Sequence, residues 1–165
     1  MYNPTFPAFR ILTLVISFSV LLVTWQPVEA QSDSAGENLV GLWKNITIRV
    51  EMKTYKGSDS SAAFIANERN WNKTMNIKPI RTHIKEDGSY ISRYYSPDDS
   101  LVMERRGNWK VHGDTLVMQE THPADNRYVA WFNLKGDTVR FRRVMDWDKD
   151  GEADDQYTGV QVRVK

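Results

Sequence analysis

The strongest chemical signal in the chain is an acidic stretch near its carboxyl end, DWDKDGEADD over residues 146–155. Side-chain oxygens stand at positions 1, 3, 5 and 9 of this stretch, position 7 offers a backbone carbonyl, and a glycine at position 6 permits a sharp turn. A hard cation takes about six to eight oxygen ligands in such a loop. Without a cation, six acidic side chains within ten residues would repel one another. The spacing therefore predicts a structural calcium site.

The stretch is a poor match to an EF-hand. An EF-hand loop has a bidentate carboxylate at position 12, where this chain has Tyr157, and both flanks here have the pattern of strands. It resembles instead the D-x-D-x-D-G-x-x-D calcium loops that join strands in integrin-type propeller blades. By position, that resemblance implies the ligands Asp146, Asp148, Asp150, the carbonyl of Glu152, and Asp154, with Asp155 as a spare. The alternative is a solvated acidic turn without an ion.

The histidines and the known catalytic motifs do not indicate an active site. We expect His83 and His112 at outward or turn positions and His122 in a loop, so no two histidines share a site. No glycine-rich phosphate loop and no serine elbow occurs. The sequence therefore predicts a protein that is not an enzyme.

Five arginines on neighbouring predicted strands allow two interpretations: Arg105, Arg106, Arg140, Arg142 and Arg143. They could form a basic stripe that binds an anion, or they could pair with nearby carboxylates across the strands. Because Glu104 and Asp137 are near and the net charge is only +1, cross-strand pairing is favoured.

The length, charge and cysteine content of the chain exclude several classes of protein. The 165 residues leave room for one domain. With 22 Lys and Arg against 21 Asp and Glu, the chain lacks the basic excess of a nucleic-acid-binding protein. The absence of cysteine excludes a disulfide scaffold, a thiolate zinc site and a cysteine nucleophile.

The first thirty residues have the pattern of a signal peptide. The run from Ile11 to Trp25 carries no charge, but it is shorter than the ~20 residues that a membrane-spanning helix needs. Val28-Glu29-Ala30 places small residues before a cut, which we expect between Ala30 and Gln31. The prediction is an exported protein, periplasmic or secreted, with no membrane span after cleavage and a polar leader over residues 31–38. An uncleaved anchor is the alternative.

From Leu39 onward, apolar and polar residues alternate, as in strands with one buried face. Tight-turn signals at Asp87-Gly88, Gly113-Asp114 and Gly136-Asp137 separate alternating arms. Eight strands follow: 39–54, 78–85, 90–95, 101–110, 115–121, 127–135, 138–145 and 157–165. The predicted fold is all-β, an eight-stranded antiparallel up-and-down meander closed into a barrel over 39–165, because closure removes exposed edges. An open sandwich of two sheets is the alternative.

The alternation also assigns an inward face. The side chains expected there are Ile46, Ile48, Val50, Ile80, Ile84, Tyr90, Trp109, Val111, Leu116, Met118, Phe132, Leu134, Val139, Phe141, Val160, Val162 and Val164. Residues 56–76 break the pattern, and we expect there a loop with a short helical turn, either a lid over one end of the barrel or a plug of that end.

Gly41-Leu42-Trp43 at the start of the first strand resembles the G-x-W start of lipocalin and calycin barrels. Gly107-Asn108-Trp109, followed by a Gly-Asp-Thr-Leu hairpin, is similar to small secreted lipocalin-like proteins of bacteria. The resemblance implies that Trp43 stacks on an arginine near the last strand, for which Arg163 is the candidate. A bend near Lys44 would bring Trp43 into phase with the rest of its strand.

The resemblance further implies binding of a small apolar or amphipathic molecule without turnover. The candidate ligand-binding residues are Tyr90, Trp109, Met118, Phe132 and Phe141 of the barrel, with Phe64 and Trp71 of the irregular segment. An eight-stranded barrel can hold one small ligand or fill itself with side chains. A filled, calcium-stabilised structural or protein-interaction module is therefore the alternative, and no protein partner is indicated.

Overall fold

The computed structural model describes residues 34–165. The predicted signal peptide, residues 1–30, and its cleavage point after Ala30 lie outside this range. No helix within 34–165 has the length and apolar character needed to cross a membrane. The part of the predicted polar leader that is described forms a short helix, α1 (Ser34–Glu37).

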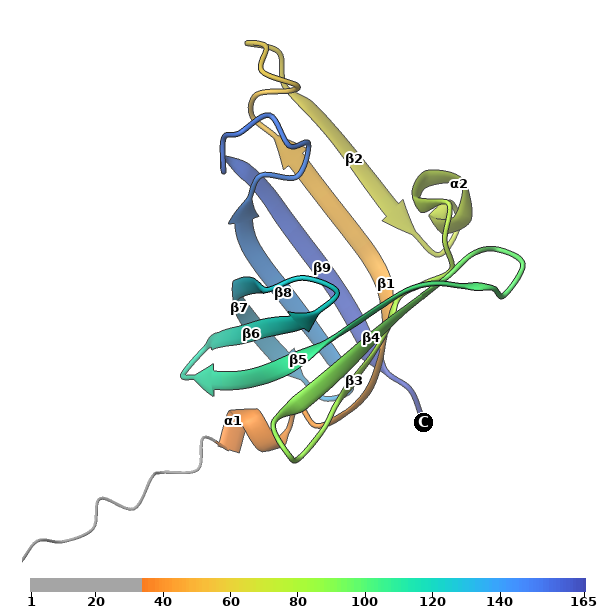
Figure 1. The fold of residues 1–165 in the computed structure, drawn as a ribbon, viewed down its shortest axis with the longest axis vertical. Helices are drawn as coiled ribbons and strands as arrows, with labels where there is room; N and C mark the ends of the chain where they lie inside the picture. Colours follow the sequence, from red (N-terminus) through yellow and green to blue (C-terminus); the bar gives the residue numbers. More distant parts are fainter. Residues whose placement is uncertain (1–33) are drawn as a thin grey trace, which may run out of the picture. The chain divides into compact units, whose positions relative to one another are not determined.

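The chain between 34 and 165 is almost entirely antiparallel sheet (Figure 1). Its strands are β1 (Gly41–Met52), β2 (Ala62–Asn67), β3 (Arg81–Ile84), β4 (Ser89–Tyr95), β5 (Leu101–His112), β6 (Thr115–His122), β7 (Asn126–Lys135), β8 (Thr138–Met145) and β9 (Asp155–Arg163). A second helix, α2 (Trp71–Met75), follows β2. Eight of these strands match the predicted ones within a few residues at each end, and β8 has the predicted bounds.

The sheet closes on itself through β1. Strands β3 to β9 pair in sequence order, while β1 pairs with β3 on one side and with β9 on the other. The predicted eight-stranded closed barrel is therefore confirmed, and it consists of β1 and β3–β9. The ninth strand, β2, pairs only with the outer half of β1, from Thr47 to Met52.

A β-bulge near the start of β1 decides which residues face inward. The pairing with β9 shifts register between Asn45 and Thr47. As a result Trp43 and Asn45 are buried on one side of the bulge, and Ile48 and Val50 are buried on the other. An extra residue in one strand shifts the alternation by one, so the bend that the sequence required near Lys44 is this bulge.

The predicted inward face is wrong on β9. Val139 pairs with Gln161 and Arg143 pairs with Tyr157, and residues directly opposite each other share a face. The inward residues of β9 are therefore Tyr157, Gly159, Gln161 and Arg163. Val160 and Val162 lie on the outer face of the strand. The valines were assigned to the inward face because they are apolar, whereas the residues that face inward on this strand are largely polar.

The irregular segment 56–76 also differs from the expectation. The expected helical turn is present as α2, but Ala62–Asn67 forms strand β2 where a loop was predicted. The turn before β2 contains Lys56 and Gly57, both with positive φ (53° and 69°), a tight-turn signal that the sequence analysis overlooked. Phe64 and the buried Trp71 pack in a cluster with Ile48, Val50 and Met52 of β1, so the segment extends the sheet.

The main core lies at one end of the barrel, called here the apolar end. Its buried members are Leu39, Trp43, Ile84, Leu116, Phe132 and Val139. Trp109, Val111 and Leu134 pack against this cluster, and Gly36 of α1 lies against Val111 and Trp109. Side chains fill this end, so any internal space lies farther along the strands.

Candidate functional site

A cavity of about 160 Å³ lies inside the barrel next to the apolar end. Every strand of the closed barrel contributes to its lining. The lining residues are Asn45, Ile80, Thr82, Ile84, Tyr90, Ser92, Tyr94, Arg105, Leu116, Met118, Tyr128, Ala130, Phe141, Arg143, Tyr157 and Gln161. The barrel is thus filled at one end and hollow farther along.

The predicted ligand-binding residues separate into three groups. Tyr90, Met118 and Phe141 line the cavity. Trp109 and Phe132 belong to the packed apolar end. Phe64 and Trp71 lie in the cluster of β1, β2 and α2, which they share with Tyr157 of the cavity wall.

The side of the cavity away from the apolar end carries polar side chains. We call it the polar end; its members are Tyr94, Arg105, Glu120, Tyr128, Arg143 and Tyr157. Along β8 the inward residues run from Val139 through Phe141 to Arg143, and along β6 they run from Leu116 to Glu120. The interior therefore changes from apolar to charged along the strands.

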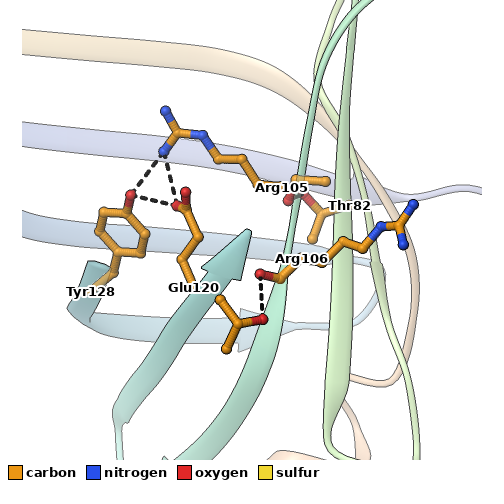
Figure 2. Close-up of polar contacts among 7 residues, drawn as sticks. Thr82, Arg105, Arg106, Glu120 and Tyr128 are labelled. Carbon is orange, nitrogen blue, oxygen red and sulfur yellow. Dashed lines mark hydrogen bonds and ion pairs between the residues drawn. The ribbon is translucent and has the colours of Figure 1, made fainter. Parts of the chain in front are cut away.

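Three side chains of the polar end form a closed network (Figure 2). Glu120, only 1% exposed, accepts a hydrogen bond of 2.6 Å from the Tyr128 hydroxyl. Arg105 Nη1 lies 2.9 Å from that hydroxyl oxygen and 3.4 Å from Glu120 Oε2. The buried carboxylate is thus held by one cation and one hydroxyl, while the buried Nε of Arg105 has no hydrogen-bond partner within 34–165.

Arg143 is held differently. Its guanidinium lies 4.9 Å from the ring centroid of Tyr128 and 5.3 Å from that of Tyr157. It makes no ion pair and no side-chain hydrogen bond to any residue of 34–165. Burial lowers the pKa of Arg143 from its ordinary value, but an arginine side chain stays protonated near neutral pH. The polar end therefore contains an unneutralised positive charge.

The tyrosines around this charge are neutral hydrogen-bonding groups. Burial raises the pKa of Tyr94 and of Tyr128, and it raises the pKa of Tyr157 to about 12. In Tyr128 the hydrogen bond to Glu120 adds to the effect. Their hydroxyls therefore keep their protons at neutral pH and remain able to donate.

The sequence pattern contains a signal for three interior groups that were not predicted: Arg105, Glu120 and Arg143. Each lies two or four residues from a predicted inward residue of its strand: Arg143 follows Phe141, Glu120 follows Met118, and Arg105 precedes Trp109. The favoured interpretation of the arginine cluster, pairing with a carboxylate across strands, is confirmed for Arg105, which pairs with Glu120 of β6. Arg106 is ion-paired with Glu104 of its own strand. The interpretation is wrong for Arg143, which lines the cavity and has no ion pair within 34–165.

Glycine at position 107 allows the close approach that positions Arg105 and Glu120. The register of β5 and β6 shifts between Arg106 and Gly107. A Cβ at Gly107 would lie 1.9 Å from the carbonyl oxygen of Gln119, which real structures do not allow. The two strands therefore meet tightly where the polar network begins.

At the apolar end, Arg163 stacks on Trp43, the contact that the resemblance implied. The guanidinium carbon lies 4.4 Å from the indole centroid. Its Nη1 and Nη2 donate to the carbonyls of Val40 (2.5 Å) and Asn38 (2.6 Å), and its Nε lies 3.3 Å from Asp137. This arginine is fully engaged in joining the last strand to the start of the first.

The acidic stretch forms the β8–β9 connection. Asp146, Asp148 and Asp155 each bring a carboxylate oxygen within 4.8 Å of the others. Asp155 is 1% exposed, and its Oδ2 accepts a hydrogen bond of 2.5 Å from the Trp147 amide. Its buried Oδ1 has no hydrogen-bond partner within 34–165, and neither has Oδ1 of Asp154. The cluster thus contains Asp155, the residue that the loop pattern treated as a spare.

Asp148 of the cluster and the neighbouring Asp150 also contact the β1–β2 turn, which lies beside the acidic loop in Figure 1. Asp148 Oδ2 accepts from the Lys56 amide at 2.6 Å. Asp150 Oδ2 accepts from the Thr54 hydroxyl at 3.0 Å and from the Gly57 amide at 3.1 Å. Hydrogen bonds from the amides of Glu152 and Gly57 lower the pKa of Asp150. The acidic loop therefore ties two distant connections together.

No protein-family model matches the chain, and the comparison with curated proteins finds no match either. Among solved structures, a lipocalin-like protein from Bacteroides uniformis is similar, with 11% sequence identity and a TM-score of 0.46. The match covers 77% of this chain and 99% of that chain. The closed barrel of this chain is established by its own strand pairing, through β1 and β9.

Proposed function

We propose that this protein binds a small apolar or amphipathic molecule inside its barrel, without turnover. The observation that carries the proposal is the cavity of about 160 Å³, to which every strand of the closed barrel contributes. A cavity of ~150 Å³ can accommodate a benzene-sized molecule. The ligand is accordingly small. The three histidines are exposed and do not line the cavity, which supports binding rather than acid–base catalysis.

The test uses benzene as a neutral probe of the cavity. A ligand that binds only the folded state raises the thermal midpoint by mass action. We expect benzene to raise the midpoint of the wild-type protein. Ala130→Leu, which fills the cavity wall, should abolish this rise, whereas Val129→Leu on the exposed side of the same strand should keep it.

An absence of any benzene effect on the wild-type protein would contradict the binding proposal and favour the filled-module alternative. Native mass spectrometry of protein purified from its source adds an independent readout. It should show a small additional mass that Ala130→Leu lacks.

The acidic loop supports a second part of the proposal, a structural calcium ion on Asp146, Asp148 and Asp155. Two ligands at ~2.3–2.6 Å from one calcium ion lie at most about 5 Å apart, and the three carboxylate oxygens lie within 4.8 Å of one another. The buried Oδ1 of Asp155 lacks a partner that an ion would supply. The ion would neutralise the cluster and strengthen the β8–β9 connection. Such a role suits an exported protein, which the first thirty residues favour.

Thermal melting with and without a chelator tests the ion. At a free calcium concentration of ~100 times Kd, binding stabilises the fold by about 2.7 kcal/mol, so the chelator should lower the midpoint clearly. Asp155→Asn keeps an acceptor for the Trp147 amide but loses a charge, so its midpoint should no longer respond to the chelator. Asp114→Asn, in the exposed β5–β6 turn, should respond like wild type. A wild-type midpoint that ignores the chelator would defeat the calcium assignment.

A further inference from the structure

The polar end of the cavity has more positive than negative charge. Arg105 and Arg143 both line the cavity. Within 34–165 the carboxylate that contacts this end is Glu120, and it is already engaged by Arg105 and Tyr128. Arg143 has no such counter-charge. One positive charge inside the barrel is thus left without an ionic partner.

Arg143 is partly buried, and a charge that is partly removed from water is stabilised when an opposite charge pairs with it. The way Arg143 is held leaves room for that partner. Tyr128 and Tyr157 lie over the guanidinium within 4.9 and 5.3 Å of their ring centroids. The ring contacts engage none of the guanidinium N–H donors in a hydrogen bond within 34–165, and these donors form a planar fork that matches a carboxylate. The geometry therefore favours an incoming carboxylate over water alone.

Apolar surface adjoins this fork. Phe141 and Arg143 are two residues apart on the same face of β8, which places them about 7 Å from each other along the strand. Leu116 and Met118 of β6 line the same cavity. An aromatic ring resting on this apolar surface could place a directly attached carboxylate on Arg143. The volume of about 160 Å³ limits the apolar body to about one ring.

We propose that the ligand of this barrel is a small carboxylate anion whose apolar body is about the size of one aromatic ring. Its carboxylate binds the edge of Arg143, and its ring lies against Phe141 and Leu116. The inference rests on the proposed binding function and adds the chemical class of the ligand. Arg143 determines the specificity for an anion, because Arg105 is already ion-paired with Glu120.

The experiment compares two probes of the same shape, benzoate and its neutral analogue benzamide, by isothermal titration calorimetry. A charge-assisted hydrogen-bonded pair is strong enough that benzoate should bind about tenfold more tightly or better. Arg143→Met should remove this preference and leave benzamide binding in place. Arg142→Met is the matched control, because Arg142 is the exposed neighbour on the same strand, and it should keep the preference.

Each result has one meaning. Equal affinities of benzoate and benzamide in the wild-type protein would overturn the inference and leave the binding function intact. A preference that survives in Arg143→Met would overturn the assignment to Arg143. Inorganic phosphate binding as tightly as benzoate would show an anion site that ignores the apolar body, which also overturns the inference. If neither aromatic probe nor benzene binds, the binding function itself fails.

Discussion

The two ends of the barrel each hold an arginine stacked on aromatic rings, and they use it in opposite ways. Arg163 covers Trp43 and is satisfied by two backbone carbonyls and Asp137. Arg143 lies over Tyr128 and Tyr157 and makes no ion pair or side-chain hydrogen bond within 34–165.

The difference shows that stacking alone does not define the role of an arginine. What matters is whether its N–H donors already have partners in the folded chain. An engaged guanidinium stabilises closure of the barrel, whereas an unengaged one in a cavity is available to a ligand. Four sets of measurements test this contrast, in order of decreasing expected effect.

Removal of the closing tryptophan should have the largest effect. Trp43 is fully buried, and its indole nitrogen donates to the Leu39 carbonyl at 2.7 Å. Trp43→Ala should lower the free energy of unfolding by about 3–5 kcal/mol, because it leaves a large cavity in the packed end. Urea unfolding measures this. Trp131→Ala, at a side chain that is 57% exposed, should change it by less than about 0.5 kcal/mol.

The paired substitutions Arg163→Met and Arg143→Met test the contrast directly. Arg163→Met should cost about 1.5–3 kcal/mol, since it leaves the carbonyls of Val40 and Asn38 without their charged donor. Arg143→Met should raise the free energy of unfolding by about 1 kcal/mol in the absence of ligand, because it removes a partly buried charge that has no ionic partner within 34–165. Losses of similar size at both positions would show that the two arginines share one structural role.

Alkaline pH should weaken the polar end. Tyr157 has a pKa of about 12 in the folded protein against an ordinary 10.0. Its contribution to stability is complete below pH 10 and is lost as pH rises toward 12, because the unfolded chain deprotonates first. One such group gives a slope of up to about 1.4 kcal/mol per pH unit. Urea unfolding at a series of pH values should show the loss, and Tyr157→Phe should reduce it.

The smallest effect is expected for an outward arginine. Arg106 is exposed and ion-paired with Glu104 on the same strand. Arg106→Ala should change the free energy of unfolding by less than about 1 kcal/mol and should leave benzoate affinity unchanged. A large change in affinity would mean that the outer arginines contribute to the site, as a basic stripe would require.

Much of the barrel could be predicted from the sequence. Gly113-Asp114 and Gly136-Asp137 gave two hairpins, because positive φ at those glycines (60° and 57°) is what tight turns need. Strand β2 was missed because it is short and lacks a clear alternation. The inward face of β9 was assigned wrongly because Val160 and Val162 look like core residues, whereas Tyr157, Gln161 and Arg163 occupy the interior.

The all-β class, the strand order and the acidic loop follow from the sequence alone, because turns and period-two alternation are local properties of the chain. Which side chains occupy the interior depends instead on the three-dimensional arrangement of the strands. Arg143 and Arg163 are alike in sequence terms, and which of them finds carbonyl partners depends on strands that meet from opposite ends of the chain. Whether a buried charge is satisfied is set by such distant neighbours.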